Sequence, residues 1–131
     1  MPLPVTAIFA GLLALWLTTL QFKVVGFRRG QLVSLGSGGH EEGERLIRGH
    51  ANAVETIPIF LILMAVSESL GTPDWVLIGI GTFFTIGRVV HGVHFFKQRE
   101  GFRLRFYGML MTIIATVAMA IGAIGHGLTG L

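Results

Sequence analysis

Residues 44–60 read ERLIRGHANAVETIPIF, a charged segment that runs into an apolar one without a break. Arg48, Asn52 and Glu55 recur at helical spacing, so a helix places them on one face. The apolar run continues to about Leu70, which is long enough to reach deep into a lipid bilayer. Ionisable side chains in a membrane helix are costly unless they face a protein interior or a ligand. This stripe is therefore the first place to look for function.

The composition indicates one integral membrane domain over residues 1–131. Of these 131 residues, 52% are hydrophobic and 13% are charged, whereas about 25% of a typical soluble domain is charged. Cysteine is absent, which excludes a disulfide, a thiolate metal site and a cysteine nucleophile. Any thiol chemistry must therefore use a thiol that the substrate carries.

Four apolar segments have the length of about 20 residues that a transmembrane helix needs. We expect an all-α membrane bundle with helices over residues 3–27, 45–70, 75–96 and 104–128. The glycine-rich segment 30–43 is expected to be a loop, 71–74 a tight turn and 97–103 a short basic connection. The first helix carries its basic residues after its apolar run, the reverse of a cleaved signal peptide, so we expect it to be retained.

The distribution of charge predicts the orientation in the membrane. All ten lysine and arginine residues fall toward one side, whereas the other side carries Glu68 and Asp74. By the positive-inside rule we expect an inner-membrane protein with cytoplasmic polar loops and both termini outside. Because the basic residues flank apolar helices, they indicate membrane lipid as a partner and no nucleic acid.

Small residues predict where helices approach one another in lipid. Gly79, Gly81 and Gly87 give the third segment a lean surface, and Ala118 and Gly122 form a small pair in the fourth. The alternative is the general abundance of glycine in membrane helices.

The stripe on the second helix suits a zwitterionic ligand with a free amino-acid end. The Arg48 guanidinium can hold a carboxylate through two hydrogen bonds, and Glu55 can accept from an ammonium. The alternative is a pair within the subunit, of Arg48 with Glu55 or Glu44, that only neutralises the helix end. Pro58 cannot donate a backbone hydrogen bond, so we expect a kink and a free carbonyl near Glu55.

The third helix carries GRVVHGVHFF over residues 87–96. Arg88 and His91 are spaced by three and share a face. Arg88 either extends to the interface or pairs with Glu55 across the bundle. His91 and His94 lack a nearby carboxylate or cysteine as a third ligand, so we expect no metal.

The fourth helix opens with FRLRFY over residues 102–107. Arg103 and Tyr107 are spaced by four and share a face, whereas Arg105 points elsewhere. A cation and a phenol facing one point favour the thiolate form of a bound thiol. The alternative is a basic flank with an interfacial tyrosine.

Together these three motifs resemble those of the MAPEG family, the membrane-associated proteins in eicosanoid and glutathione metabolism. The R-x-x-x-N-x-x-E core of ERLIRGHANAVETI is similar to the second-helix signature of microsomal prostaglandin E synthase and the microsomal glutathione transferases. GRVVHGVHF and FRLRFY resemble segments of the family's third and fourth helices. The order of the motifs, the chain length and the four-helix pattern agree, and the small size is similar to that of bacterial members.

The resemblance implies a homotrimer with glutathione sites between neighbouring subunits, open to the cytoplasm. Arg103 would stabilise the thiolate as the catalytic residue. The implied glutathione ligands are Arg48, Asn52, Glu55, Arg88, His91, Tyr107 and Arg28. Three positions depart from prostaglandin E synthase and argue against prostaglandin synthesis: an arginine, a tyrosine and a serine of that enzyme are replaced by Ala51, Phe95 and Leu104.

The implied activity is transfer of glutathione to hydrophobic electrophiles, with reduction of lipid hydroperoxides as a related reaction. Two other classes of function compete with it. One is a non-catalytic scaffold that binds lipid or glutathione, which the family also contains. The other is a small transporter that uses Glu55 as a proton or cation site, although Arg48 within reach of Glu55 disfavours it.

Overall fold

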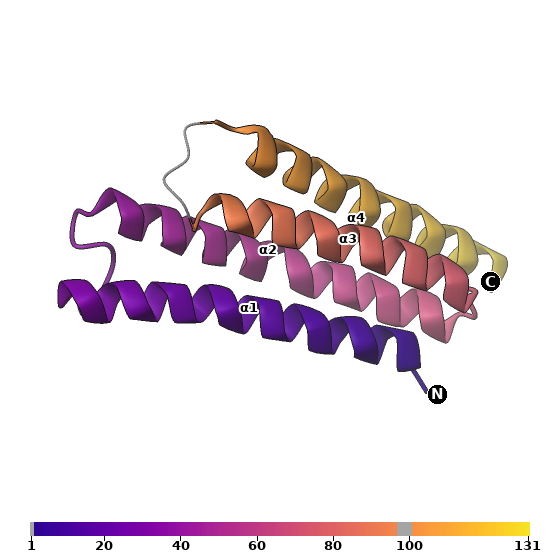
Figure 1. Ribbon diagram of the computed structural model, residues 1–131. Helices are drawn as coiled ribbons and strands as arrows, with labels where there is room; N and C mark the ends of the chain where they lie inside the picture. Colours follow the sequence, from indigo (N-terminus) through magenta and orange to yellow (C-terminus); the bar gives the residue numbers. More distant parts are fainter. Residues whose placement is uncertain (1, 97–100) are drawn as a thin grey trace.

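The computed structural model is a bundle of four antiparallel helices with both termini at one end (Figure 1). It describes residues 2–96 and 101–131. In chain order the helices are α1 (Pro4–Gln31), α2 (Glu41–Ser69), α3 (Asp74–His94) and α4 (Arg103–Thr129). All four are long and apolar enough to cross a membrane, which confirms the predicted fold class. Most of the expected basic connection, with Lys97 and Arg99, lies outside the described residues.

The loop between α1 and α2 is shorter than the sequence predicts, because both helices extend into the expected 30–43 segment. Two hydrogen bonds order what remains of it. The Arg28 Nε donates to the Gly36 carbonyl at 3.1 Å, and the Ser37 hydroxyl donates to Glu44 Oε1 at 2.6 Å. Acidic residues in the first turn of α2 favour this earlier start by opposing the positive end of the helix dipole.

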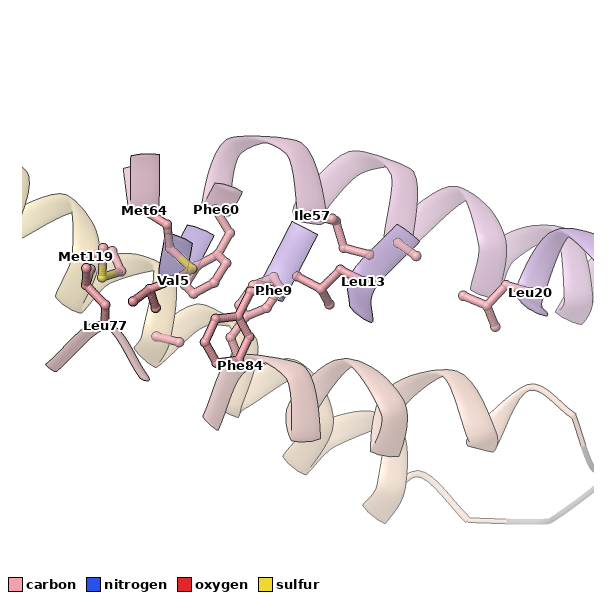
Figure 2. Close-up of a cluster of buried hydrophobic side chains, with 12 residues drawn as sticks. Val5, Phe9, Leu13, Leu20, Ile57, Phe60, Met64, Leu77, Phe84 and Met119 are labelled. Carbon is pink, nitrogen blue, oxygen red and sulfur yellow. The ribbon is translucent and has the colours of Figure 1, made fainter. Parts of the chain in front are cut away.

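The larger apolar core contains residues of all four helices and extends along α1 from Val5 to Leu20 (Figure 2). At its centre the rings of Phe60 from α2 and Phe84 from α3 stack with centroids 3.7 Å apart, and both side chains are fully buried. Leu13 from α1 and Met119 from α4 complete the contact among the four helices. The α2 helix is continuous through Pro58, so this proline does not end it.

Glu68 holds the start of α1 against the end of α2. Its carboxylate oxygens accept hydrogen bonds from the backbone N–H groups of Val5 at 2.9 Å and Thr6 at 2.8 Å. These amides belong to the first turn of α1, where no helical partner is available. A carboxylate also opposes the positive end of the helix dipole there. From the sequence, Glu68 served only to predict the orientation in the membrane. In the structure it lies on α2 and caps the start of α1.

Glycines set the distance between α3 and α4. A Cβ on Gly108 would lie 2.5 Å from the His91 backbone nitrogen, and one on Gly87 would lie 3.1 Å from the Gly108 carbonyl oxygen. Gly81 packs against the ring of Phe9 from α1. Of the three α3 glycines predicted to allow close helix contact, Gly81 and Gly87 lie at such contacts. A Cβ on Gly79 would meet nothing within 4 Å.

Candidate functional site

Arg88 of α3 is the largest fully buried side chain among the described residues. Its Nη2 donates to Asn52 Oδ1 of α2 at 2.8 Å, and its Nη1 donates to Thr112 Oγ1 of α4 at 3.4 Å. The same Nη2 lies 3.4 Å from His91 Nδ1. Arg88 therefore joins three helices through polar side chains. It neither extends to the interface nor pairs with Glu55, so both alternatives from the sequence are wrong.

The close approach of α3 and α4 creates this arrangement. Because Gly108 has no side chain, the α4 backbone lies directly against His91. One turn later the Thr112 hydroxyl donates to the Gly108 carbonyl at 2.9 Å. That bond uses the hydroxyl proton, so the oxygen of Thr112 is free to accept from Arg88. Packing of glycine on backbone thus fixes the partners of the buried guanidinium.

Two adjoining cavities open beside this cluster. The first, here called the polar cavity, has a volume of about 210 Å³ and is lined by Glu44, Arg45, Arg48, Asn52, His91, Phe95 and Arg105. The second, here called the apolar cavity, has a volume of about 450 Å³ and is lined by Asn52, His91, Phe102, Arg105, Phe106, Met109, Leu110 and Ile113. Asn52, His91 and Arg105 line both. The polar cavity and the apolar cavity therefore meet at these three side chains.

The structure brings four of the predicted residues together. Asn52, Arg88 and His91 form the hydrogen-bonded cluster, and Arg48 lines the polar cavity beside two of them. Among the described residues no salt bridge joins Arg48 to Glu44 or Glu55. Glu44 instead accepts a hydrogen bond from the Ser37 hydroxyl.

Four other predicted residues lie elsewhere in the chain. Glu55, Arg103 and Tyr107 are exposed and line neither cavity. Arg28 donates a hydrogen bond to the Gly36 carbonyl and so stabilises the loop after α1. The roles that the resemblance assigns to these residues remain predictions.

Sequence reasoning missed Arg45 and Arg105 as cavity residues. Arg105 does point away from the face of Arg103 and Tyr107, but that direction leads into both cavities. A helical signal was present, since Arg105, Met109 and Thr112 recur at spacings of four and three on α4. All three contact or line the site.

The structure thus defines a class of protein: a four-helix membrane bundle with a polar cluster buried between three of its helices. The sequence profile of the MAPEG family matches residues 6–125. The chain is also 38% identical over 118 residues to "Inner membrane protein YecN" of Escherichia coli (strain K12), which covers 86% of this chain and 90% of that protein. The protein of the same name in a second Escherichia coli strain matches equally well. The chain belongs to the MAPEG family.

Proposed function

We propose that this protein is a glutathione transferase of the inner membrane. It adds the glutathione thiolate to hydrophobic electrophiles, and reduction of lipid hydroperoxides is the related activity. One observation carries the proposal: a polar cavity and an apolar cavity share Asn52, His91 and Arg105. A conjugation reaction between a charged peptide and an apolar partner needs both environments at one point.

The polar cavity suits glutathione, which has two carboxylates and one ammonium. Arg48 can hold a carboxylate through paired hydrogen bonds, and Glu44 can accept from the ammonium. Arg88 supports the site from behind, because its bonds orient Asn52 and His91. Its buried position makes it a positioning residue.

The apolar cavity suits the electrophile. Ligand sites are typically cavities of about 300–1,000 Å³ with mainly apolar walls and a few polar groups, and this one has a volume of about 450 Å³. Phe102, Phe106 and Ile113 supply the apolar lining. Holding the two reactants at a shared wall converts their encounter into a step within one complex. Stabilisation of the thiolate then supplies the nucleophile at neutral pH.

We further propose that the protein is a homotrimer with cytoplasmic loops and both termini outside. Glu55 is exposed on α2, inside a helix that is apolar enough to span the membrane. A charged side chain facing lipid is costly, so a neighbouring subunit is the expected cover. The same arrangement would let the exposed Arg103 and Tyr107 face a cavity in the next subunit.

The test is purification in mild detergent, calorimetric titration with reduced glutathione, and turnover with chlorodinitrobenzene and cumene hydroperoxide. We expect binding and conjugation by the wild type, and loss of both in Asn52→Ala. Gln31→Ala is the matched control, since Gln31 ends α1 and lines neither cavity. Binding without turnover would support the non-catalytic scaffold. A wild type that neither binds glutathione nor turns over either substrate would refute the proposal.

A further inference from the structure

A third cavity lies between α1 and the start of α2, at the end of the bundle away from the chain termini (Figure 1). This cavity, here called the lateral cavity, has a volume of about 380 Å³, within the usual range of ligand sites. None of its lining residues lines the polar or the apolar cavity, so it is separate from the proposed glutathione site. Its walls include Phe22, Lys23, Gly26, Gly30, Glu42 and Phe96.

Two glycines of α1 leave the space that forms the cavity. Gly26 and Gly30 are spaced by four and so lie on one face of the helix. A Cβ on either would meet nothing within 4 Å, in contrast to Gly108 at the contact between α3 and α4. These glycines therefore open the wall of the lateral cavity and do not bring two helices of the chain together.

The cavity holds one positive and one negative side chain. Lys23 comes from α1, and Glu42 comes from the first turn of α2. Among the described residues no salt bridge joins them. The Lys23 ammonium lies instead over the Phe96 ring, 5.0 Å from its centre, a cation–π contact that holds the charge at one wall. Opposite charges that stand apart in one cavity complement a ligand that carries both signs.

The position of the cavity on α1 indicates a ligand from the membrane. Its lining extends from Phe22 to Gln31, about 14 Å along the helix. Phe22 belongs to a helix apolar enough to span the bilayer and is 70% exposed, whereas Gln31 ends that helix beside the polar loop. The cavity therefore crosses the zone where lipid headgroups meet acyl chains, and charged pockets between membrane helices in this zone recognise lipid headgroups.

We propose that the lateral cavity binds a phospholipid whose headgroup carries a phosphate and a primary ammonium, as in phosphatidylethanolamine. Lys23 donates to the phosphate, and Glu42 accepts from the ammonium. The acyl chains leave past the exposed ring of Phe22. A quaternary ammonium fits less well, because it has no N–H to donate to Glu42 and because the Phe96 ring already faces Lys23. The inference does not depend on the proposed transferase activity.

Native mass spectrometry of the detergent-solubilised protein tests the site with three phospholipids that have the same acyl chains. Phosphatidylethanolamine carries both groups, phosphatidylcholine has a quaternary ammonium, and phosphatidylglycerol has none. We expect the first to bind at least about tenfold more tightly than the other two, since one hydrogen bond between charged groups supplies this factor. Equal binding of all three lipids, or tighter binding of phosphatidylcholine or phosphatidylglycerol, would overturn the proposal.

Two variants assign the effect to the charged side chains. Lys23→Gln should weaken phosphatidylethanolamine and phosphatidylglycerol alike, by about tenfold, because both lipids carry the phosphate. Glu42→Gln should weaken phosphatidylethanolamine alone and so remove the preference between these two lipids. Arg29→Gln is the control for a lost charge, since Arg29 is exposed near the end of α1 and lines none of the three cavities.

A third variant fills the cavity without removing a charge. Gly26→Leu should lower the binding of phosphatidylethanolamine at least about tenfold, because its side chain occupies the space that the glycine leaves. Gly11→Leu is the matched control on the same helix, since a Cβ there also meets nothing within 4 Å and Gly11 does not line the cavity.

The outcomes separate the lipid site from the proposed activity. Unchanged lipid preference in Lys23→Gln and Glu42→Gln proteins that elute as monodisperse species overturns the site. Dissociation of an oligomer by Gly26→Leu also overturns it, because a second copy of the chain would then be the occupant. Lost lipid preference with unchanged glutathione binding supports the site. A wild type that selects phosphatidylethanolamine but neither binds nor turns over glutathione supports the lipid site and overturns the transferase.

Discussion

The contact between Gly108 and the backbone of His91 predicts that even a methyl group at position 108 will separate α3 from α4. A Cβ there would lie 2.5 Å from the His91 nitrogen and 2.7 Å from its Cα. Backbone atoms cannot rotate out of the way as a side chain can, so the helices must move apart. We expect Gly108→Ala to lower both thermal stability and glutathione binding, because His91 lies at the junction of the two cavities.

The magnitude follows from a comparison with Gly122→Ala on the same helix. A Cβ on Gly122 meets nothing within 4 Å. Both substitutions gain about 1 kcal/mol of helix propensity, so this contribution cancels between them. The remaining difference is the cost of overpacking, typically about 1–3 kcal/mol. At about 4 °C per kcal/mol for a domain of this size, Gly108→Ala should unfold about 4–12 °C below Gly122→Ala.

The assay is thermal unfolding of both variants in the same detergent, followed by circular dichroism, with calorimetric titration of glutathione on each. Gly11→Ala is a second control on α1, since its added Cβ also meets nothing within 4 Å. Equal unfolding temperatures for the variants at positions 108 and 122 would refute the reasoning. It would mean that α3 and α4 do not approach as closely as the structure shows.

The remaining predictions concern Glu68, Arg88 and Arg103. Glu68→Ala should destabilise the protein by about 1–2 kcal/mol, because it leaves the amides of Val5 and Thr6 without a partner. Glu68→Gln should lower the free energy of unfolding by about half as much. Equal unfolding temperatures for the two variants and the wild type would exclude the cap. Arg88→Met should abolish glutathione binding while leaving the unfolding temperature unchanged or raised, since an apolar side chain of similar length avoids the cost of a buried charge; retained binding would remove Arg88 as the positioning residue. Arg103→Ala should lower the conjugation rate more than glutathione affinity, as measured by steady-state kinetics beside calorimetry, and equal rates would remove its catalytic role.

Exposed polar groups on the outer surface of the bundle bear on the proposed homotrimer. Glu55 lies on the outer surface of a membrane helix, and Arg103 begins α4 without lining either cavity. Cross-linking of the solubilised protein, with Glu55→Gln as a variant, would test whether a second subunit covers this surface. A monomer that still binds glutathione would show that the site within one subunit is sufficient.

The sequence by itself determined the number of membrane helices, their approximate limits and their antiparallel order, because apolar length and turn residues are local properties. It also identified Asn52, Arg88 and His91 as polar groups within apolar helices, where burial against protein is the only favourable environment. The errors in helix ends are equally local. Both helices extend into the predicted loop, and hydrogen bonds from Arg28 and Ser37 order the residues between them. The residue pattern does not reveal such bonds.

Only the tertiary structure decided which polar groups meet. Spacing along one helix places side chains on a face, but the rotation of one helix against another is fixed by packing between them. At the α3–α4 contact Gly87 and Gly108 let the backbones approach, and this approach brings Thr112 to Arg88. The same packing directs Arg105, not Arg103, toward the two cavities. The distance between the helices thus determines which polar side chains form the site. The sequence could only place these side chains on separate helices.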